Sequence, residues 1–348
     1  MKVKKEKLKQ LMKVKLHKAG LSDNHADMAA EILAWSDERG YHSHGAVRVE
    51  YYSERIAKGG ITTNPEFKFE KTGPASGMYY GDNGCGYVAA TFSMEEAIKM
   101  AKESGVAVVG VKNISHSGSL GYYVEMAAKE GLIGISLCQS DPMVVPYGGS
   151  ESYYGTNPIA FGVPTADDRA VIFDMATTVQ AWGKILFSRS KGEAIPDTWA
   201  VDEDGNPTTD STKVNALVPA AGAKGYGLMM MVDVLSGVLL GVPFGKHVSS
   251  MYADLSKGRD LGQLHIVLDP SRFTDIDSFK KNMSTVLDEL GEIKPAKGFD
   301  KVYYPGERAL LRKEKYKDGI EIVNDIYDYL VSDDIHFNNY DHKNKFAE

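Results

Sequence analysis

The spacing of hydrophobic residues predicts helices over about the first 60 residues of the chain. Residues 22–40 begin at Ser22, a residue type that commonly caps helix N-termini, and end at a glycine. Residues 43–60 begin at Ser43 and end at two glycines, so we expect one continuous helix there. A first helix precedes both, and its apolar face consists of Leu8, Leu11, Met12 and Leu16.

Between about residues 73 and 176 the pattern changes to short β-branched runs that alternate with helical segments. The predicted strands are "GMYYG" (77–81), "VAVVGVK" (106–112), "LIGISLC" (132–138), "AVIFDM" (170–175) and, later, "GQLHIVLDP" (262–270). Helical patterns return after about residue 178. We therefore predict an α+β protein with two discontinuous domains. The expected ranges are 1–72 with 177–244 and 296–348 for a mainly helical domain, and 73–176 with 245–295 for a sheet-containing domain.

One apolar run, "YGLMMMVDVLSGVLLGVPF" (226–244), has about the length of a membrane span. Asp233 and Ser236 interrupt it, however, and no basic residues anchor its ends. The run therefore predicts a buried core helix that ends near its glycine and proline. We expect no membrane partner.

The overall composition is that of a soluble globular protein, with 348 residues, 43% hydrophobic and 25% charged. The net charge of −7 argues against a nucleic-acid partner, so the basic N-terminal run is interpreted as the solvated face of the first helix. No apolar segment or cleavage site of a secretory signal follows that run. The two cysteines, Cys85 and Cys138, are too few for a disulfide framework and are typical of a reducing cytoplasm.

Two glycine-rich motifs resemble nucleotide-binding loops. "GCGYVA" (84–89) matches a dinucleotide fingerprint, but the acidic residue expected at the end of the next strand is missing, because Lys112 and Asn113 stand there. These glycines are interpreted as a tight turn instead. "GAKGYG" (222–227) lacks the Ser or Thr of a phosphate-binding P-loop, although Lys224 at a helix start can still meet a phosphate. No Cys/His group has zinc spacing, so we expect no metal.

The spacing of His44, Arg48 and Tyr52 places them on one face of the helix predicted from Ser43. An imidazole, a guanidinium and a phenol on one face suit a small substrate carboxylate, which Arg binds through paired hydrogen bonds. The alternative is an ordinary amphipathic helix whose polar face is solvated.

His116 stands between a predicted strand and the predicted start of a helix at residue 119. The positive end of a helix disfavours a protonated imidazole, so a neutral His116 can act as a general base. It can equally be a turn histidine with local hydrogen bonds. Two further strand-end turns carry acids: Asp141 can orient an imidazole or form a turn, and Asp174 can bind ribose hydroxyls or cap a helix.

Several motifs in a fixed order resemble the type-2 malate/L-lactate dehydrogenase family. They are "SHGAVR", "NISHSG", "TNPIAFGVP", "DMATT", "GAKGYGLMMMVDVLSGVLLG" and "YPGER", spread over about residues 5–330. The resemblance implies a non-Rossmann fold, with a mixed-sheet α/β cofactor-binding domain. It also implies NAD as cofactor and a homodimer with its sites near the subunit contact.

Longer stretches, such as "CQSDPMVVPYGG", "IPDTWAVD" and "HVSSMYADLSKGRDLGQLHIVLDP", are most similar to family members that oxidise (S)-ureidoglycolate to oxalurate in allantoin breakdown. Sister enzymes that act on malate, lactate or sulfolactate, or that reduce 2-oxo acids or cyclic imines, share the shorter motifs. The resemblance implies that His116 is the proton acceptor and that Ser43, His44, Arg48 and Tyr52 bind the substrate. It implies cofactor contacts at Ser140, Asp174, Met175, Ala176, Lys224, Gly306, Glu307 and Arg308.

Overall fold

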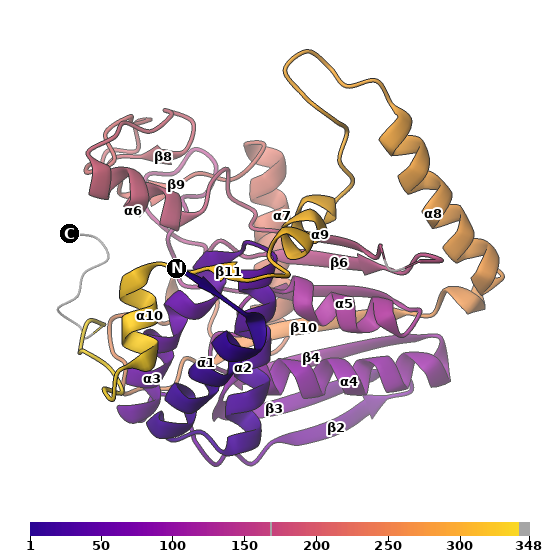
Figure 1. Cartoon of the computed structure of the whole chain (residues 1–348), viewed down its shortest axis with the longest axis horizontal. Helices are drawn as coiled ribbons and strands as arrows, with labels where there is room; N and C mark the ends of the chain where they lie inside the picture. Colours follow the sequence, from indigo (N-terminus) through magenta and orange to yellow (C-terminus); the bar gives the residue numbers. More distant parts are fainter. Residues whose placement is uncertain (168, 341–348) are drawn as a thin grey trace.

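The computed structural model of the chain describes residues 1–167 and 169–340. Its centre is a seven-stranded mixed sheet with the strand order β2-β3-β4-β10-β5-β6-β7 (Figure 1). The strands are β2 (Lys68–Gly73), β3 (Ser76–Gly84), β4 (Val106–Ile114), β5 (Ile133–Cys138), β6 (Ile159–Val163), β7 (Val171–Met175) and β10 (Leu261–Leu268). Within this sheet β3 and β4 pair in parallel, and the other neighbouring strands pair antiparallel.

The position of β10 brings distant segments to one edge of the sheet. Although it comes late in the chain, β10 lies between β4 and β5 and runs antiparallel to both. Leu261, at its start, therefore pairs with Ile114 at the end of β4, and Gln263 pairs with Cys138 at the end of β5. The segment just before β10 thus lies beside the turns that follow β4 and β5, which carry His116 and Asp141.

Helices cover the sheet and pack against one another at one end of it (Figure 1). They are α1 (Lys5–Ala19), α2 (Asp23–Glu38), α3 (Val49–Ala57), α4 (Gly86–Ser104), α5 (Gly121–Lys129), α6 (Trp182–Lys191), α7 (Ala223–Asp233), α8 (Ile276–Glu292), α9 (Glu307–Lys315) and α10 (Asn324–Val331). Two short antiparallel pairs complete the described part: β1 (Lys2–Val3) with β11 (Ile320–Glu321), and β8 (Ala200–Val201) with β9 (Ala216–Leu217). The first of these ties the start of the chain to its C-terminal region.

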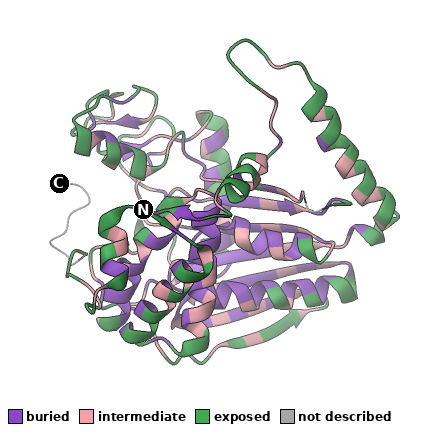
Figure 2. Ribbon diagram, in the orientation of Figure 1, coloured by how far each residue is buried: buried purple, intermediate pink, exposed green. Residues whose placement is uncertain are grey.

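The buried residues concentrate in the sheet and in the faces of the helices turned toward it (Figure 2). One hydrophobic cluster joins Leu8 of α1, Val88 of α4, Val109 of β4 and Leu330 of α10. Side chains from both proposed domains therefore share a core. The division into two discontinuous domains stays a prediction.

The predicted strands are all present, and Ser22 caps α2 as expected, because its hydroxyl accepts a hydrogen bond from the His25 backbone N–H (3.2 Å). Two strands of the seven-stranded sheet were missed, as were the four two-residue strands β1, β8, β9 and β11. β2 is an edge strand with the polar sequence "KFEKTG", and β6 is a five-residue segment. Neither segment is long and apolar enough to stand out from its own sequence, and pairing with neighbours defines both.

The helix predicted over residues 43–60 is wrong at its start. Two 3-10 turns, His42–His44 and Ala46–Arg48, come first, and the α-helix begins only at Val49. The break occurs at Gly45, where a Cβ atom would lie 2.2 Å from the carboxyl carbon of Asp37. That buried carboxylate accepts a hydrogen bond from the Ala46 N–H (2.7 Å), so a side chain takes the place of the first helical turn.

The interpretation of residues 226–244 as a buried core helix is also wrong. The segment forms the end of α7 and a π-helical turn (Val234–Val238), with Met229 and Val232 buried. Leu228, Met231 and Leu239, however, are 38%, 48% and 59% exposed. An apolar face of this segment is therefore open. No helix in residues 1–167 and 169–340 has the length and apolarity needed to cross a membrane.

A buried histidine in β10 predicts that acid destabilises the fold. None of the His265 residue is exposed. Burial lowers the pKa of His265 to about 3, against about 6.5 in an unfolded chain. Between these values the unfolded chain binds a proton that the folded chain excludes. The free energy of unfolding should therefore fall by about 1.4 kcal/mol per pH unit as the pH drops below 6.5.

Urea denaturation at pH 7.5 and at pH 5.5 measures this effect. His265→Phe should lose about 1 kcal/mol less stability between the two pH values than the parent chain. His247→Gln, which changes an exposed histidine, should behave like the parent. An equal loss in the parent and in His265→Phe would contradict the prediction.

Candidate active site

The turn that carries His116 is tied down on both sides by its flanking serines. Ser115 Oγ accepts a hydrogen bond from the Gly86 N–H (2.8 Å), and Ser117 Oγ donates one to Gln263 Oε1 (2.7 Å). The turn is thus bound to the start of α4 and to β10. A Cβ atom on Gly86 would lie 2.1 Å from the Ser115 carbonyl oxygen. This close approach explains the glycine of "GCGYVA" without a nucleotide.

His116 forms a hydrogen-bonded chain with two tyrosines. Its Nδ1 lies 2.6 Å from the hydroxyl of Tyr52 in α3, and that hydroxyl lies 3.1 Å from the hydroxyl of Tyr87 in α4. Both tyrosines are buried, whereas His116 is half-buried. With Nδ1 engaged inward, Nε2 is the ring nitrogen left for chemistry.

Burial favours a neutral imidazole at His116. It lowers the pKa of this ring well below the ordinary value, and electrostatic interactions with His44 and with the cationic Arg48 and Arg259 lower it further. The following helix begins at Gly121 rather than at residue 119, and the Gly121 N–H donates to the Asp174 carboxylate (2.8 Å). A lowered pKa agrees with the expected neutral imidazole, and burial is its largest cause.

Arg48 is oriented by two hydrogen bonds beside this imidazole. Its Nε donates to the Ser43 carbonyl (2.8 Å), and its Nη1 donates to the Tyr252 hydroxyl (2.6 Å). Burial opposes the charge of Arg48, but the surrounding phenols, Tyr252 first, leave its pKa raised. The guanidinium is therefore a permanent cation in the site.

His44 completes the group. Its ring centroid lies 5.9 Å from that of His116, and its Nδ1 lies 2.9 Å from Ser43 Oγ. Burial, with a contribution from Arg48, lowers the pKa of His44 to about 4. The structure thus brings Ser43, His44, Arg48 and Tyr52 around His116. They do not lie on one face of a continuous helix, which was the basis of the prediction.

Three residues of this cluster were missed at the sequence level: Tyr87, Tyr252 and Arg259. Arg259 is only 2% exposed and donates from Nη2 to the Ser249 carbonyl (2.5 Å) and to Asp141 Oδ1 (3.4 Å). No periodicity marks Tyr252 or Arg259, because both lie in the irregular segment before β10. The position of β10 alone brings them here.

Asp141, whose role was open, anchors that segment. Besides its contact with Arg259, its Oδ2 accepts a hydrogen bond from the Met251 N–H (3.1 Å). From the other side, the Tyr51 hydroxyl and Arg55 Nη1 both donate to the Met251 carbonyl (3.0 and 3.2 Å). Asp141 therefore holds the loop that presents Tyr252 to Arg48.

The residues expected to contact the cofactor gather around β7. Asp174, the last residue but one of this strand, accepts the hydrogen bond from the Gly121 N–H at the start of α5, and burial raises its pKa to about 6. Gly306, with φ of 94°, lies so close to β7 that a Cβ would be 2.8 Å from the Ile172 carbonyl. This left-handed glycine lets "YPGER" pack against the strand. Met175 and Ala176 follow Asp174 and are half-buried.

A cavity of about 650 Å³ adjoins Gly306. Aromatic and cationic side chains line it, and Arg308 stacks over the Tyr303 ring at 4.5 Å. Glu307 faces Lys301 through an ion pair. The lining includes Tyr41, Phe173, Phe299, Tyr303, Arg308 and Arg312.

Ser140 and Lys224 lie on segments next to this region. Ser140 Oγ accepts a hydrogen bond from the Thr156 N–H (2.8 Å), which joins the turn after β5 to the chain before β6. Lys224 is exposed at the start of α7, shortly after Ala220, whose N–H donates to the Thr177 carbonyl (2.9 Å). Both therefore border the strand ends that carry the other predicted cofactor residues.

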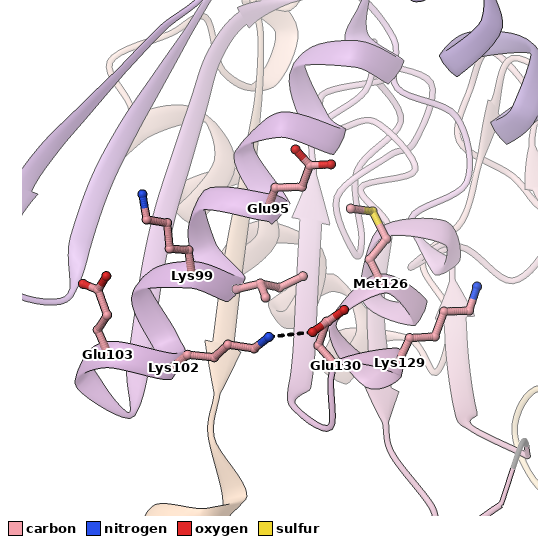
Figure 3. Close-up of a pocket in the computed structure, with 8 residues that line it drawn as sticks. Glu95, Lys99, Lys102, Glu103, Met126, Lys129 and Glu130 are labelled. Carbon is pink, nitrogen blue, oxygen red and sulfur yellow. Dashed lines mark hydrogen bonds and ion pairs between the residues drawn. The ribbon is translucent and has the colours of Figure 1, made fainter.

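Two other features of the described residues show no comparable chemistry. A surface groove between α4 and α5 carries lysines and glutamates over Ile98 and Met126, and Lys102 and Glu130 pair across it at 2.5 Å (Figure 3). Its charges of opposite sign are interspersed and face solvent. No group of three or more His, Cys, Asp or Glu side chains in the described residues is arranged to hold a metal ion.

Comparison with known proteins identifies the family. The sequence matches the malate/L-lactate dehydrogenase family over residues 3–331. The chain belongs to this family. The expected resemblance is thereby confirmed, and the mixed α/β sheet agrees with the fold of the solved family structures.

Individual members are similar over nearly the whole chain. Ureidoglycolate dehydrogenase (NAD+) of Escherichia coli (strain K12) is 58% identical over 349 residues, which covers 100% of both chains. The structure of sulfolactate dehydrogenase from Methanocaldococcus jannaschii has a TM-score of 0.89 at 37% identity and covers 95% of each chain. Delta1-piperideine-2-carboxylate reductase from Pseudomonas syringae has a TM-score of 0.87 at 30% identity, covering 95% of this chain and 98% of that one.

The ion pair between Asp141 and the buried Arg259 predicts a large effect on stability. Asp141→Ala leaves the Arg259 guanidinium buried without its carboxylate, so it should lower the free energy of unfolding by about 3 kcal/mol, measured by urea denaturation. As a control, Asp288→Ala removes an exposed partner of Arg169 and should cost less than about 1 kcal/mol. Equal small losses in both variants would show that Asp141 does not anchor the loop.

Proposed function

We propose that the chain is an NAD-dependent ureidoglycolate dehydrogenase that oxidises (S)-ureidoglycolate to oxalurate. The observation that carries this proposal is a neutral imidazole, His116, beside a cationic Arg48 in a chain 58% identical to such an enzyme over its full length. Oxidation of a secondary alcohol needs a base for the hydroxyl proton, and a 2-hydroxy acid needs a cation for its carboxylate. The site provides both within one cluster.

His116 accepts the alcohol proton in this scheme. If Nδ1–H donates to the Tyr52 oxygen, Nε2 carries no proton and can accept one. The phenol oxygen of Tyr52 has two lone pairs, so it can accept from both His116 and Tyr87. Tyr52, expected to bind substrate, therefore contributes first by fixing the tautomer of His116.

Arg48 binds the substrate carboxylate in the same scheme. A guanidinium has five N–H donors, and the bonds to Ser43 and Tyr252 leave others for the carboxylate. A carboxylate held at Arg48 fixes which face of the alcohol carbon is presented to the cofactor. Ser43 and His44 line the same space and are proposed to contact the rest of the substrate.

The residues around β7 fit a dinucleotide. Aromatic side chains can stack on a base, Arg308 and Lys224 can face phosphates, and the half-buried Asp174 carboxylate can accept hydrogen bonds from ribose hydroxyls. Ser140, Met175, Ala176, Gly306 and Glu307 complete the proposed cofactor contacts. When bound, NAD+ supplies the hydride acceptor. We propose that it binds here and not, as in a Rossmann fold, at residues 84–89.

Substrate assays decide between this and two other functions. The family description and the solved relatives favour, as the second candidate, oxidation of malate, lactate or sulfolactate, or reduction of a 2-oxo acid or cyclic imine. A third possibility from another class is a non-catalytic binder of small anions. NADH formation should be at least tenfold faster, as kcat/KM, with ureidoglycolate than with the other acids, and faster with NAD+ than with NADP+. NADH binding without turnover of any substrate would favour the anion binder.

His116 and Tyr52 should respond differently to substitution. His116→Ala should reduce kcat by about 10²–10⁴-fold, because the proton acceptor is lost. Tyr52→Phe should reduce kcat by about 10–100-fold with little change in KM, because the acceptor that orients His116 is lost. Steady-state kinetics at pH 7–9 measures both effects. Unchanged turnover in His116→Ala would exclude the base, and a rise in KM alone for Tyr52→Phe would indicate direct substrate binding.

The exposed apolar face of residues 228–239 supports a homodimer. Leu228, Met231 and Leu239 share this open face, and Lys224, a proposed cofactor contact, begins the same helix. A second copy covering the face would bury apolar area beside the site. Sedimentation of the parent chain should give a dimer mass, whereas Leu239→Asp should shift it toward a monomer. A parent chain that sediments as a monomer would contradict the proposal.

The cellular setting is proposed on chemical grounds. Cys85 and Cys138 are free thiols, as expected for a reducing cytoplasm. Oxidation of ureidoglycolate places the reaction in allantoin breakdown. The assignment to allantoin breakdown depends on the proposed substrate, and the assignment to the cytoplasm depends on the two free thiols.

A further inference from the structure

The C-terminal segment, residues 337–340, follows the last helix of the described chain and packs beside the candidate active site. The backbone N–H of Phe337 donates to Glu50 Oε1 (3.0 Å), and the side-chain amide of Asn339 donates to the same oxygen (2.8 Å). The Tyr340 N–H donates to Glu54 Oε2 (3.2 Å). Glu50 and Glu54 are one turn apart on α3, so they fix the segment along this helix.

Through these bonds the Tyr340 ring lies against Tyr252. The two rings are stacked, with centroids 5.9 Å apart and planes inclined by 22°. On another side, Tyr51 of α3 meets Tyr252 edge-on at 5.4 Å and meets Tyr340 edge-on at 5.7 Å. Tyr252 is therefore packed between an aromatic ring of α3 and an aromatic ring of the C-terminal segment.

Tyr252 in turn determines how Arg48 is presented. Its hydroxyl accepts the Arg48 Nη1–H at 2.6 Å, while the Ser43 carbonyl accepts the Nε–H. These two bonds define the plane of the guanidinium. The loop backbone at Met251 is held separately by Tyr51, Arg55 and Asp141. Loss of the Tyr340 ring would thus leave the loop anchored but its tyrosine supported on fewer sides.

We propose that Tyr340 is a positioning residue for substrate binding. Its ring fixes the orientation of Tyr252, and Tyr252 fixes the guanidinium plane of Arg48 for the substrate carboxylate. This inference rests on the proposed function of Arg48. The C-terminal segment thereby has a role in substrate affinity. Neither the sequence of the segment nor its distance along the chain from Arg48 indicates this role.

Substitutions at Tyr340 test this role in the full-length protein. Tyr340→Ala removes the ring and should raise KM for the oxidised 2-hydroxy acid about five- to tenfold, with kcat and KM for NAD+ within twofold of the parent. Tyr340→Phe keeps the ring and should restore the parent KM. Phe337→Ala is the matched control, because this side chain of the same segment packs on Tyr329 (5.6 Å).

The outcomes separate this inference from the proposed function. An unchanged substrate KM in Tyr340→Ala overturns the inference, as does an equal rise in Phe337→Ala or a joint change of kcat and both KM values. The substrate is whichever 2-hydroxy acid the parent oxidises, so a failure of ureidoglycolate alone leaves the test intact. If the parent oxidises none, calorimetric titration of the NADH complex with oxalate replaces KM. An affinity that is five- to tenfold weaker in Tyr340→Ala supports the inference, and an equal affinity overturns it.

Discussion

The hydrogen bond between the Tyr52 hydroxyl and His116 Nδ1 is the contact on which the site depends. It joins a helix from the N-terminal region to the turn that follows a central strand. Tyr52 is buried and bonded to Tyr87, so its oxygen is fixed, and the imidazole is fixed with it. A neutral ring with one nitrogen engaged inward can exchange a proton only through the other. Because Arg48 directly precedes α3, the helix that carries Tyr52, the same contact sets the base relative to the cation.

Much of the fold could be predicted because its signals are local. The strand β4 and the helix α2 with its Ser22 cap follow from spacing and capping residues alone. The edge strand β2 and the short β6 could not be predicted, since partners rather than their own apolar residues stabilise them. Residues 226–244 were wrongly predicted to be a buried core helix. The hydrophobicity of a segment does not show whether the same chain covers its apolar face or leaves that face exposed.

The site was predicted in part for the wrong reasons. His44, Arg48 and Tyr52 converge on His116, yet Gly45 and the Asp37 carboxylate break the helix on which their spacing argument rested. Burial is the largest cause of the lowered pKa of His116, and no sequence pattern indicated it. Tyr252, Arg259 and Tyr340 lay beyond prediction. Strand order brings the first two to the site and the packing of the chain end brings the third, and no short pattern encodes either.

The most direct test of this account is a crystal structure of the protein with NADH and oxalurate bound. We predict His116 Nε2 within hydrogen-bond distance of the 2-oxo oxygen, Nδ1 still on Tyr52, and the product carboxylate on Arg48. The nicotinamide ring should lie against the reacting carbon and close to His116. A nicotinamide far from His116, with no connection to it even through one water molecule, would contradict the account.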